Sequence, residues 1–396
     1  DRGVREKIWR AFVSRGRNGN AHDNREIIGE IVGLRTELAG LLGYETYAEY
    51  KLADTMAKTP EAAQGLLEQV WAPGRERAAE DAKALQGLVD TAGDGVTLEP
   101  WDWRYYAEKL RLARYDFDES AIKPYLQLEK VVDAAFYTAS RLFGVSFTPR
   151  PDIDGYHPDV RVWSVERGGK TIGLFYGDFF ARPGKRSGAW MTSFRDQQKL
   201  GGEVLPLIVN TCNFNKPPDG EPALLSLDEA RTVFHEFGHG LHGLLSDVTY
   251  PRISGTSTVR DYVELPSQLY EHWLEQPPVL ERLTHYKTGA PIPAELLERM
   301  KAARNANIGF ETVEMISSAL LDMAYHNHRP GEPVDADSIE RETLERIGMP
   351  HEIALRHASP HFLHIFSGDG YSAGYYSYLW SEVLDADAFE AFAETG

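Results

Sequence analysis

The sequence predicts a mainly helical protein with one small β-sheet in the middle of the chain, and three observations support this. Apolar residues recur at helical spacing from Val4 to about Gly144. Strand-like stretches appear only between about Val145 and Asn210. Helical patterns resume at Ser226 and fill most of the remaining sequence. The fold class is therefore mainly α with a small sheet.

Helix boundaries in the first part are indicated by proline and glycine. Thr59-Pro60-Glu61 predicts a helix start, because proline suits the first helical position. Pro73-Gly74 is expected to interrupt or kink this helix. Another amphipathic helix is predicted from Leu128 to Leu142 and should end at Gly144.

The strand signals lie in the middle of the chain. Val160 to Val165 and Thr171 to Phe179 are strand-like, and Gly168-Gly169 between them predicts a tight hairpin turn. A third strand is expected from Leu205 to Asn210. We therefore divide the chain into a helical segment, residues 1–144, and a sheet-containing part, residues 145–396, that together form one continuous structural unit.

Composition and charge exclude several classes of partner. The chain of 396 residues carries a formal net charge of -18, which would be repelled by nucleic acid or by an anionic membrane surface. The single cysteine, Cys212, allows no intrachain disulfide and is expected to be a small buried residue rather than a nucleophile. The apolar runs are far shorter than a membrane span, and the N-terminus has no signal-peptide core. The expected location is the cytoplasm.

A metal-binding motif follows the capping pattern at Ser226. His235 and His239 are four residues apart on the predicted helix, so both imidazoles project from one face and can bind a single ion. Glu236 is placed to reach a water on that metal rather than the metal itself. This five-residue pattern arises by chance in roughly four of a hundred chains of this composition. Two buried histidines and a surface glutamate are the alternative.

A zinc site needs a third protein ligand. His242 shares the helical face but would have to bend back across a full turn, so we expect it to pack beside the ligands. Glu264 is the better candidate, because it lies where the next apolar helix begins. Glu271, on the same face, could accept the outer N–H of a ligand histidine, with a helix-surface charge as the alternative.

Several separated motifs resemble the thimet oligopeptidase family of zinc metallopeptidases, with the closest likeness to bacterial dipeptidyl carboxypeptidases. The main ones are FHEFGHGLH, from Phe234 to His242, and RDYVELPSQ, from Arg260 to Gln268. Other stretches that resemble the family are Tyr156 to Trp163, Phe175 to Arg182, Gly188 to Met191, Thr211 to Pro217 and Gly370 to Trp380. The resemblance covers essentially the whole chain. It implies a multi-helix zincin-like fold, one zinc ion and Glu264 as third ligand.

The resemblance also implies a mechanism. Zinc lowers the pKa of a bound water to about 7, and Glu236 is expected to take its proton and deliver it to the leaving amine. Tyr371 and Tyr378 match tyrosines that stabilise the tetrahedral intermediate, whereas Tyr375 is expected to pack in the core. His364 matches a histidine that contacts substrate.

Substrate contacts are expected at a strand edge near the zinc helix, where extended peptide backbone can pair. The residues we assign to this contact are Gly173, Phe175, Gly188 and Ala189. An ordinary internal strand from Gly173 to Phe180 is the alternative. The glycine-rich loop from Ser367 to Gly370 is expected to swing Tyr371 into place.

We expect a zinc metallopeptidase that releases C-terminal dipeptides from short peptides and is a monomer. The alternatives are an endo-acting oligopeptidase and a non-catalytic peptide-binding relative. The free substrate carboxylate needs a basic partner, for which Lys185, Arg186 and Arg260 are unresolved candidates. Family members are longer at both ends and use helices, including those matching residues 1–144, to wall a channel. A fragment and a naturally short version are both open.

Overall fold

The computed structural model describes residues 1–93 and 95–395, which form two compact units. Among the described residues, the helical unit comprises 1–93, 95–116, 259–261 and 301–380, and the sheet unit comprises 117–258, 262–300 and 381–395. The first strand begins at Val145, where the sequence pattern changes. The compact units nevertheless part at Asp116, because the helix from Leu128 to Phe143 packs against that strand and against the helix from Leu227 to Leu244.

The helical unit is built around two long helices, α4 and α11, which pack side by side. Its helices are α1 (Arg2–Val13), α2 (Arg25–Leu41), α3 (Tyr47–Leu52), α4 (Pro60–Ala92), α5 (Pro100–Tyr115), α11 (Ile308–His326), α12 (Ala336–Ile347) and α13 (Leu363–Phe366). Close approach of α4 and α11 requires glycine, because a Cβ on Gly309 would lie 2.5 Å from the backbone nitrogen of Ala78.

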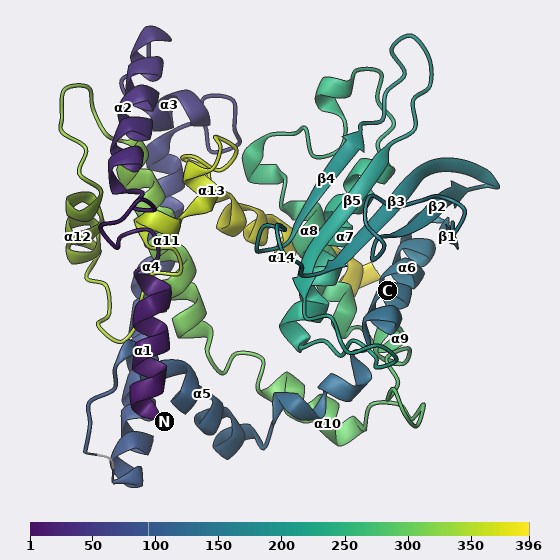
Figure 1. Cartoon of the computed structure of the whole chain (residues 1–396), viewed down its shortest axis with the longest axis horizontal. Coiled ribbons are helices and arrows are strands. Elements are labelled where there is room, and N and C mark those ends of the chain that lie inside the picture. The colour runs from purple at the N-terminus through teal and green to yellow at the C-terminus, as the bar shows by residue number, and fades with distance from the viewer. Residues whose placement is uncertain (94, 396) are drawn as a thin grey trace. The chain divides into compact units, whose positions relative to one another are not determined.

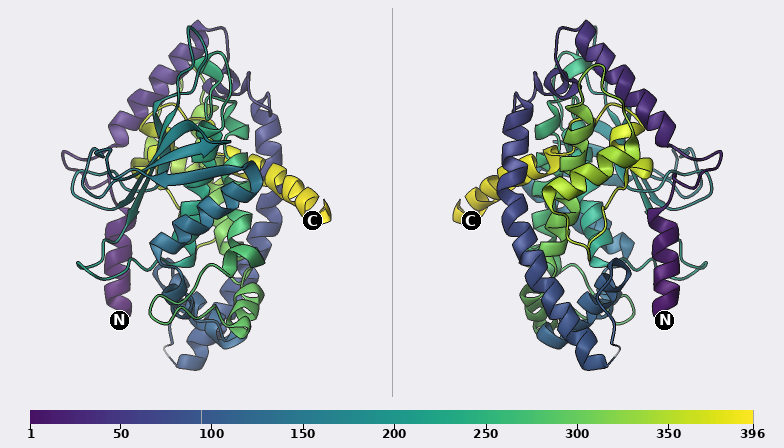
Figure 2. Two further views of the ribbon diagram at one scale, coloured as in Figure 1. Left: turned by 90° about the vertical axis from the view of Figure 1, so that its right-hand side faces the viewer. Right: turned by 90° about the vertical axis from the view of Figure 1, so that its left-hand side faces the viewer.

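We expected an interruption or a kink at Pro73-Gly74; helix α4 is continuous over its length, so the interruption is absent (Figure 2). It begins as predicted, with Thr59 accepting a hydrogen bond from the N–H of Ala62 and proline in the first turn. Pro73 lies inside the helix, next to Gly74, whose missing side chain leaves room for Thr312 of α11. Tertiary packing against α11 therefore outweighs the local preference for a helix end.

The sheet unit contains five strands in the order β1-β2-β3-β5-β4 (Figure 1). They are β1 (Val145–Pro149), β2 (Arg161–Arg167), β3 (Lys170–Phe180), β4 (Trp190–Arg195) and β5 (Leu207–Phe214). Among these described strands, β3 and β5 pair in parallel and the other neighbours pair antiparallel. The predicted hairpin joins β2 and β3 through Gly168 and Gly169, at φ 58° and 78°. A mainly α fold with a small sheet is thus confirmed, although β1 and β4 were not predicted.

Helices α6 and α7 lie against the sheet (Figure 1). The helices of this unit are α6 (Leu128–Phe143), α7 (Leu227–Leu244), α8 (Leu265–Glu271) and α9 (Pro277–Leu280). Two more helices, α10 (Ala294–Ala302) and α14 (Ser377–Thr395), contribute residues to both units. Short 3-10 turns are η1 (Glu119–Ala121), η2 (Lys123–Tyr125), η3 (Pro251–Ile253), η4 (Arg260–Tyr262), η5 (His272–Glu275) and η6 (Ser359–His361).

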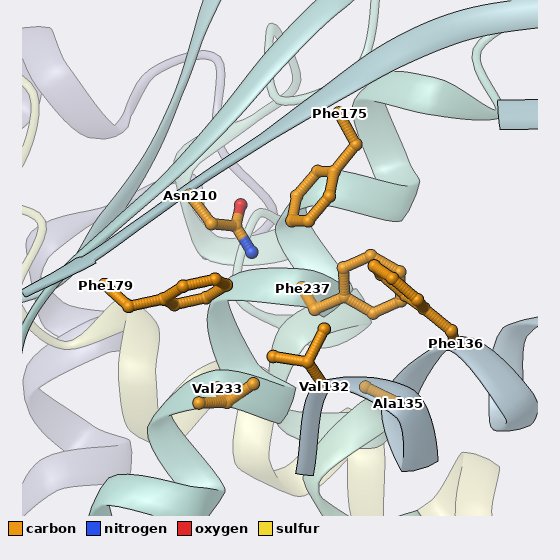
Figure 3. Close-up of a pocket in the computed structure, with 8 residues that line it drawn as sticks. All are labelled: Val132, Ala135, Phe136, Phe175, Phe179, Asn210, Val233 and Phe237. Atoms are coloured by element: carbon orange, nitrogen blue, oxygen red, sulfur yellow. The ribbon is translucent and has the colours of Figure 1, made fainter. Parts of the chain in front are cut away.

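An aromatic core fills the space between α6, α7 and the sheet. The ring of Phe237 on α7 lies 5.3 Å from that of Phe136 on α6 and 5.2 Å from that of Phe175 on β3. Figure 3 shows these rings around a cavity of about 10 Å³, with Asn210 as its polar residue. That volume holds one water at most, so this cavity is not a substrate site. Cys212 is buried on β5, and burial raises the pKa of its thiol.

Among the helices of residues 1–93 and 95–395, none is sufficiently long and apolar to traverse a lipid bilayer.

Candidate active site

Helix α7 begins at the capping box that the sequence predicts. The Ser226 hydroxyl accepts from the N–H of Glu229, and the Glu229 carboxylate accepts from the N–H of Ser226. Further along, Gly238 allows α8 to approach closely, since a Cβ there would lie 2.7 Å from the carbonyl oxygen of Pro266. This contact brings the start of α8 next to the histidines of α7.

His235, His239 and Glu264 lie together in the sheet unit. The Oε2 atom of Glu264 is 3.0 Å from Nε2 of His239 and 3.3 Å from Nε2 of His235. One ligand atom from each residue lies within 4.8 Å of the others, as expected for groups that could hold one ion. The structure therefore brings together the three residues that we predicted as ligands.

The chemistry of this group fits a zinc ion. Two imidazole nitrogens and one carboxylate form a ligand set that leaves one coordination position open, as catalytic zinc sites do. Glu236, next to these ligands in sequence, is 5% exposed, and its Oε2 has no hydrogen-bond partner among the described residues. A buried carboxylate oxygen without a partner is costly, and a metal-associated water would satisfy it.

The electrostatics keep Glu264 ionised. Burial alone would raise the pKa of Glu264, but hydrogen bonds with His235 and His239 outweigh it and hold this pKa well below its ordinary value. Glu236 behaves in the opposite way. Its burial is only partly offset by the two histidines, so its pKa is raised. The two neighbouring carboxylates are therefore suited to different tasks, one as a ligand and the other as a base.

Two further side chains contact the predicted ligands. Glu271 places Oε1 2.7 Å from Nδ1 of His235, the contact that we expected it to make. Ser267, which the sequence analysis missed, donates its buried hydroxyl to the Glu264 carbonyl at 2.8 Å and lies 3.2 Å from Glu264 Oε2. Its position three residues after Glu264 on a helix was the available signal.

His242 lies outside the group of ligands. Its ring makes an edge contact with Tyr262 at 6.5 Å between centroids. Burial, followed by the nearby His239, lowers its pKa.

Tyr371, Tyr378 and His364 form a second cluster, in the helical unit. The two tyrosine rings stack at 5.5 Å with an interplanar angle of 1°. His364 lies 5.9 Å from the Tyr371 ring and 6.4 Å from the Tyr378 ring. Tyr375 is buried beside them, and the guanidinium of Arg260 lies 4.7 Å from the Tyr371 ring. The structure thus brings the three predicted residues together, while their catalytic roles stay predictions.

Comparison with known proteins identifies the family. The sequence profile of peptidase family M3 matches residues 1–396 of the chain. The chain belongs to peptidase family M3. This confirms the family resemblance seen in the sequence motifs.

The relatives of the M3 chain include peptidases that are named for different modes of cleavage or for different locations. It is 45% identical to the dipeptidyl carboxypeptidase of Escherichia coli, an alignment that covers 100% of this chain and 59% of that protein. It is 37% identical to oligopeptidase A of Escherichia coli, with 99% and 59% covered. Mitochondrial intermediate peptidase 1 of Cryptococcus neoformans is 32% identical, with 88% and 52% covered. The M3 chain therefore spans 59% of the length of these two bacterial relatives.

The strand that we predicted to offer a free edge, β3, is internal in the sheet of the M3 chain. Strand β3 pairs with β2 on one side and β5 on the other, so the prediction that Gly173 and Phe175 offer a free edge is wrong. Gly173 is enclosed by Pro206 and Leu244, and Phe175 is 1% exposed in the aromatic core. The internal strand that we kept as an alternative is the one observed.

Strand β4 forms one edge of the described sheet and begins directly after Gly188 and Ala189, the two other residues predicted to contact the peptide. The Asn213 side chain donates to the carbonyl of Gly188 at 2.8 Å and thereby ties this loop to β5. Gly188 and Ala189 therefore remain predicted peptide contacts.

Lys185 is already engaged within the M3 chain. Its ammonium group lies 2.9 Å from Oδ1 of Asp178 and also donates to the carbonyls of Asp178 and Phe180. Its side chain is 4% exposed, so it is not available to a substrate carboxylate. Burial would raise the pKa of Asp178, but the hydrogen bonds from Arg182, Lys185 and Tyr156 lower it to about 2. This buried charged cluster was not recognised in the sequence.

Proposed function

We propose that the chain hydrolyses peptide bonds in short peptides with one zinc ion held by His235, His239 and Glu264. The convergence of these side chains beside Glu236 carries the proposal. When bound, zinc supplies positive charge that polarises the scissile carbonyl and makes water acidic enough to ionise near neutral pH.

The neighbouring carboxylates handle protons and orientation. Glu236 takes a proton from the attacking water and delivers it to the leaving amine, a task that suits a buried carboxylate with a raised pKa. Glu271 accepts the Nδ1–H of His235, which leaves Nε2 free to bind the metal. The positions of these groups around the predicted ligands support both roles.

The tyrosine cluster supplies hydrogen-bond donors for the reaction. In this proposal, the hydroxyls of Tyr371 and Tyr378 stabilise the oxyanion, and His364 contacts the peptide. The edge of β4, beginning beyond Gly188 and Ala189, pairs with the extended peptide backbone. Backbone pairing tolerates many side chains, which suits an enzyme acting on varied short peptides.

Release of C-terminal dipeptides is the leading mode of cleavage, because the relative at 45% identity is named dipeptidyl carboxypeptidase. Endo-acting cleavage is the second candidate, supported by the 37% identity to oligopeptidase A. The presence of Glu236 beside all three ligands argues against a non-catalytic peptide-binding protein. Monomeric state and cytoplasmic location remain predictions from the sequence.

Mass spectrometry of products from a defined peptide mixture tests the activity and the mode of cleavage. We expect C-terminal dipeptides with zinc present and no products after chelation. Peptides with an amidated C-terminus should resist cleavage if the free carboxylate is required. Unimpaired cleavage of amidated peptides would replace the carboxypeptidase assignment with the endo-acting one, and chelator-resistant cleavage would refute the metal mechanism.

The role of Glu236 is tested by Glu236→Gln. We expect normal zinc content by elemental analysis with turnover reduced by about 10³-fold or more, because the base is lost while the ligands stay. Asp228→Asn makes the same chemical change on the exposed first turn of α7 and should keep full activity. An active Glu236→Gln variant would refute the assigned base.

A further inference from the structure

The segment that carries Tyr371 and Tyr378 follows a backbone path that needs support. Ala373 has a φ of 54°, in the left-handed region that residues with a Cβ rarely adopt. The N–H of Gly374 donates to the carbonyl of Tyr371 at 2.9 Å, which closes a tight turn around Ala373. Such a conformation persists only where the surrounding structure holds it.

One buried carboxylate binds this turn on both sides of Gly374. Asp322, near the end of α11, is 0% exposed. Its Oδ1 accepts the N–H of Ala373 and its Oδ2 accepts the N–H of Tyr375, each at 2.9 Å. Both hydrogen bonds involve a charged acceptor in a dry environment, where they are strong. Both N–H groups lie between Tyr371 and Tyr378, so one carboxylate binds the backbone between these tyrosines at two points.

His326 contacts Asp322, and Arg35 in turn contacts His326. Nδ1 of His326 lies 2.7 Å from Oδ1 of Asp322, and its Nε2 lies 3.0 Å from Nη1 of Arg35. Because arginine only donates, Nε2 must accept, and the proton of a neutral imidazole then sits on Nδ1 and is donated to Asp322. The N–H of Ala373 therefore binds Asp322 and not the adjacent Nδ1 at 3.2 Å.

Arg35 also binds the segment before Tyr371. Its guanidinium donates to the carbonyl of Ile365 at 2.6 Å and to the carbonyl of Gly368 at 2.7 Å. The chain is thus tied at Gly368 and again at the two N–H groups bound by Asp322. Only residues 369–372 lie between these ties.

We propose that Asp322, His326 and Arg35 are positioning residues that hold Tyr371 and Tyr378 in their working arrangement. The catalytic part of this inference rests on the proposed function, whereas the holding of the backbone does not. The sequence led us to expect that the glycine-rich loop from Ser367 to Gly370 swings Tyr371 into place, but these ties leave fewer residues free to move. Movement of Tyr371 involves residues 369–372 and not the whole glycine-rich loop.

Hydrogen exchange of the full chain tests the holding of the backbone. In Asp322→Asn the NH2 group can no longer accept a backbone N–H, so amides in the peptide 372–376 should exchange at least about tenfold faster. Asp102→Asn is the matched control. Asp102 is equally buried, binds Arg2 and Arg5, and accepts the N–H of Glu99 at the start of α5. Unchanged exchange in Asp322→Asn would overturn the inference.

Kinetics test the catalytic part. We expect kcat of Asp322→Asn to fall about tenfold or more while KM changes less than about threefold, because the tyrosines act in the transition state. Combined with Tyr378→Phe, the variant should lose little beyond the larger single loss. If Asp322→Asn showed faster exchange but the same kcat as Asp102→Asn, the role of Asp322 in positioning the tyrosines for catalysis would be overturned. If the zinc-loaded wild type cleaves no peptide, the proposed function fails, and the exchange result still decides the holding of the backbone.

Arg35→Lys provides the second variant, since Asp322→Asn could prevent folding. Arg35 is only partly buried, and lysine keeps its charge but cannot bind His326, Ile365 and Gly368 together. We expect exchange in the peptide 372–376 to rise at least about threefold and kcat to fall in proportion. A folded Arg35→Lys variant with wild-type exchange would overturn the role of the network.

Discussion

At the scale of single residues, the side chain of Ser267 contacts the predicted metal ligand Glu264. It is fully buried, and its hydroxyl lies within 3.2 Å of the Glu264 carboxylate while also bonding the Glu264 carbonyl. We expect Ser267→Ala to weaken zinc binding about tenfold, as loss of a group that orients a ligand commonly does. Competition with a chelating dye measures this affinity.

The control for this prediction is Ser140→Ala in α6. The Ser140 hydroxyl donates to the carbonyl of Phe136, so its removal also deletes a local hydrogen bond. Zinc affinity should not change there. Equal affinity in both variants would show that the Ser267 hydroxyl supports only the helix backbone.

His357 is a residue whose burial should appear in the pH dependence of stability. Burial, followed by the nearby charges of His364 and Arg356, lowers the pKa of His357 to about 3. Between pH 6.5 and 3 the unfolded chain binds a proton that the folded chain does not, so the free energy of unfolding falls as the pH falls. Its ring stacks on Phe362 at 4.9 Å, a contact that phenylalanine can reproduce.

We therefore expect His357→Phe to flatten the decline of stability between pH 6.5 and 4. The slope should decrease by up to about 1.4 kcal/mol per pH unit. Thermal unfolding followed at several pH values measures this slope. His22→Gln, at an exposed histidine, should leave it unchanged. A variant with the wild-type slope would show that His357 takes no part in the acid sensitivity.

At the scale of elements, the approach of α7 and α8 depends on Gly238. A Cβ there would meet the Pro266 carbonyl and the Ser267 backbone at 2.7 Å, so the two helices would have to separate. We expect Gly238→Ala to reduce the free energy of unfolding by about 1–3 kcal/mol, as overpacking does, and to weaken zinc binding because Glu264 moves with α8. Chemical denaturation and metal titration measure the two effects.

Gly87→Ala is the matched control for this prediction. Gly87 is exposed within α4, and nothing lies within 4 Å of its added Cβ. This substitution should stabilise the protein by about 0.5–1 kcal/mol, because alanine favours helix more than glycine does. If Gly238→Ala were equally stabilising, the close contact between α7 and α8 would not exist in solution.

At the scale of the whole molecule, the metal ligands belong to one compact unit only. In the proposed site, a zinc ion bound by His235, His239 and Glu264 would link α7 to the start of α8 within the sheet unit. Ligand at a thousand times its dissociation constant stabilises the folded state by about 4 kcal/mol. We expect chelation to increase hydrogen exchange strongly in α7 and α8 and much less in α4 and α11. Equal increases in both units would contradict a site confined to the sheet unit.

Much of the local structure could be predicted from the sequence. The end of α6 at Gly144, the cap of α7 at Ser226 and the β2–β3 hairpin all occur where expected, since each depends on residues a few positions apart. The interruption of α4 that we allowed at Pro73 is absent, and the strands β1 and β4 were not predicted. Pro73 is accommodated by packing against α11, and β1 and β4 are short strands defined by their partners.

The candidate site also has parts that the sequence predicted and parts that depend on packing between elements. The spacing of His235, Glu236 and His239 was sufficient to predict one face of a helix with two ligands. Glu264 was predicted from its place at the start of the next apolar helix and then by the family resemblance, and the structure brings it to 3.0 Å from His239. The substrate edge was misplaced, because strand order cannot be inferred from the periodicity of one strand: β3 is internal and β4 lies at an edge.

By itself, the sequence determined that His235 and His239 lie on one face of a helix, because residues at i and i+4 share a face wherever that helix lies. Only the tertiary structure decided which distant groups support the site. Glu264 reaches His239 because α7 and α8 meet at Gly238. Asp322 and Arg35 hold the tyrosine segment although they are separated from it along the chain. Such contacts depend on packing between elements, which local sequence patterns do not encode.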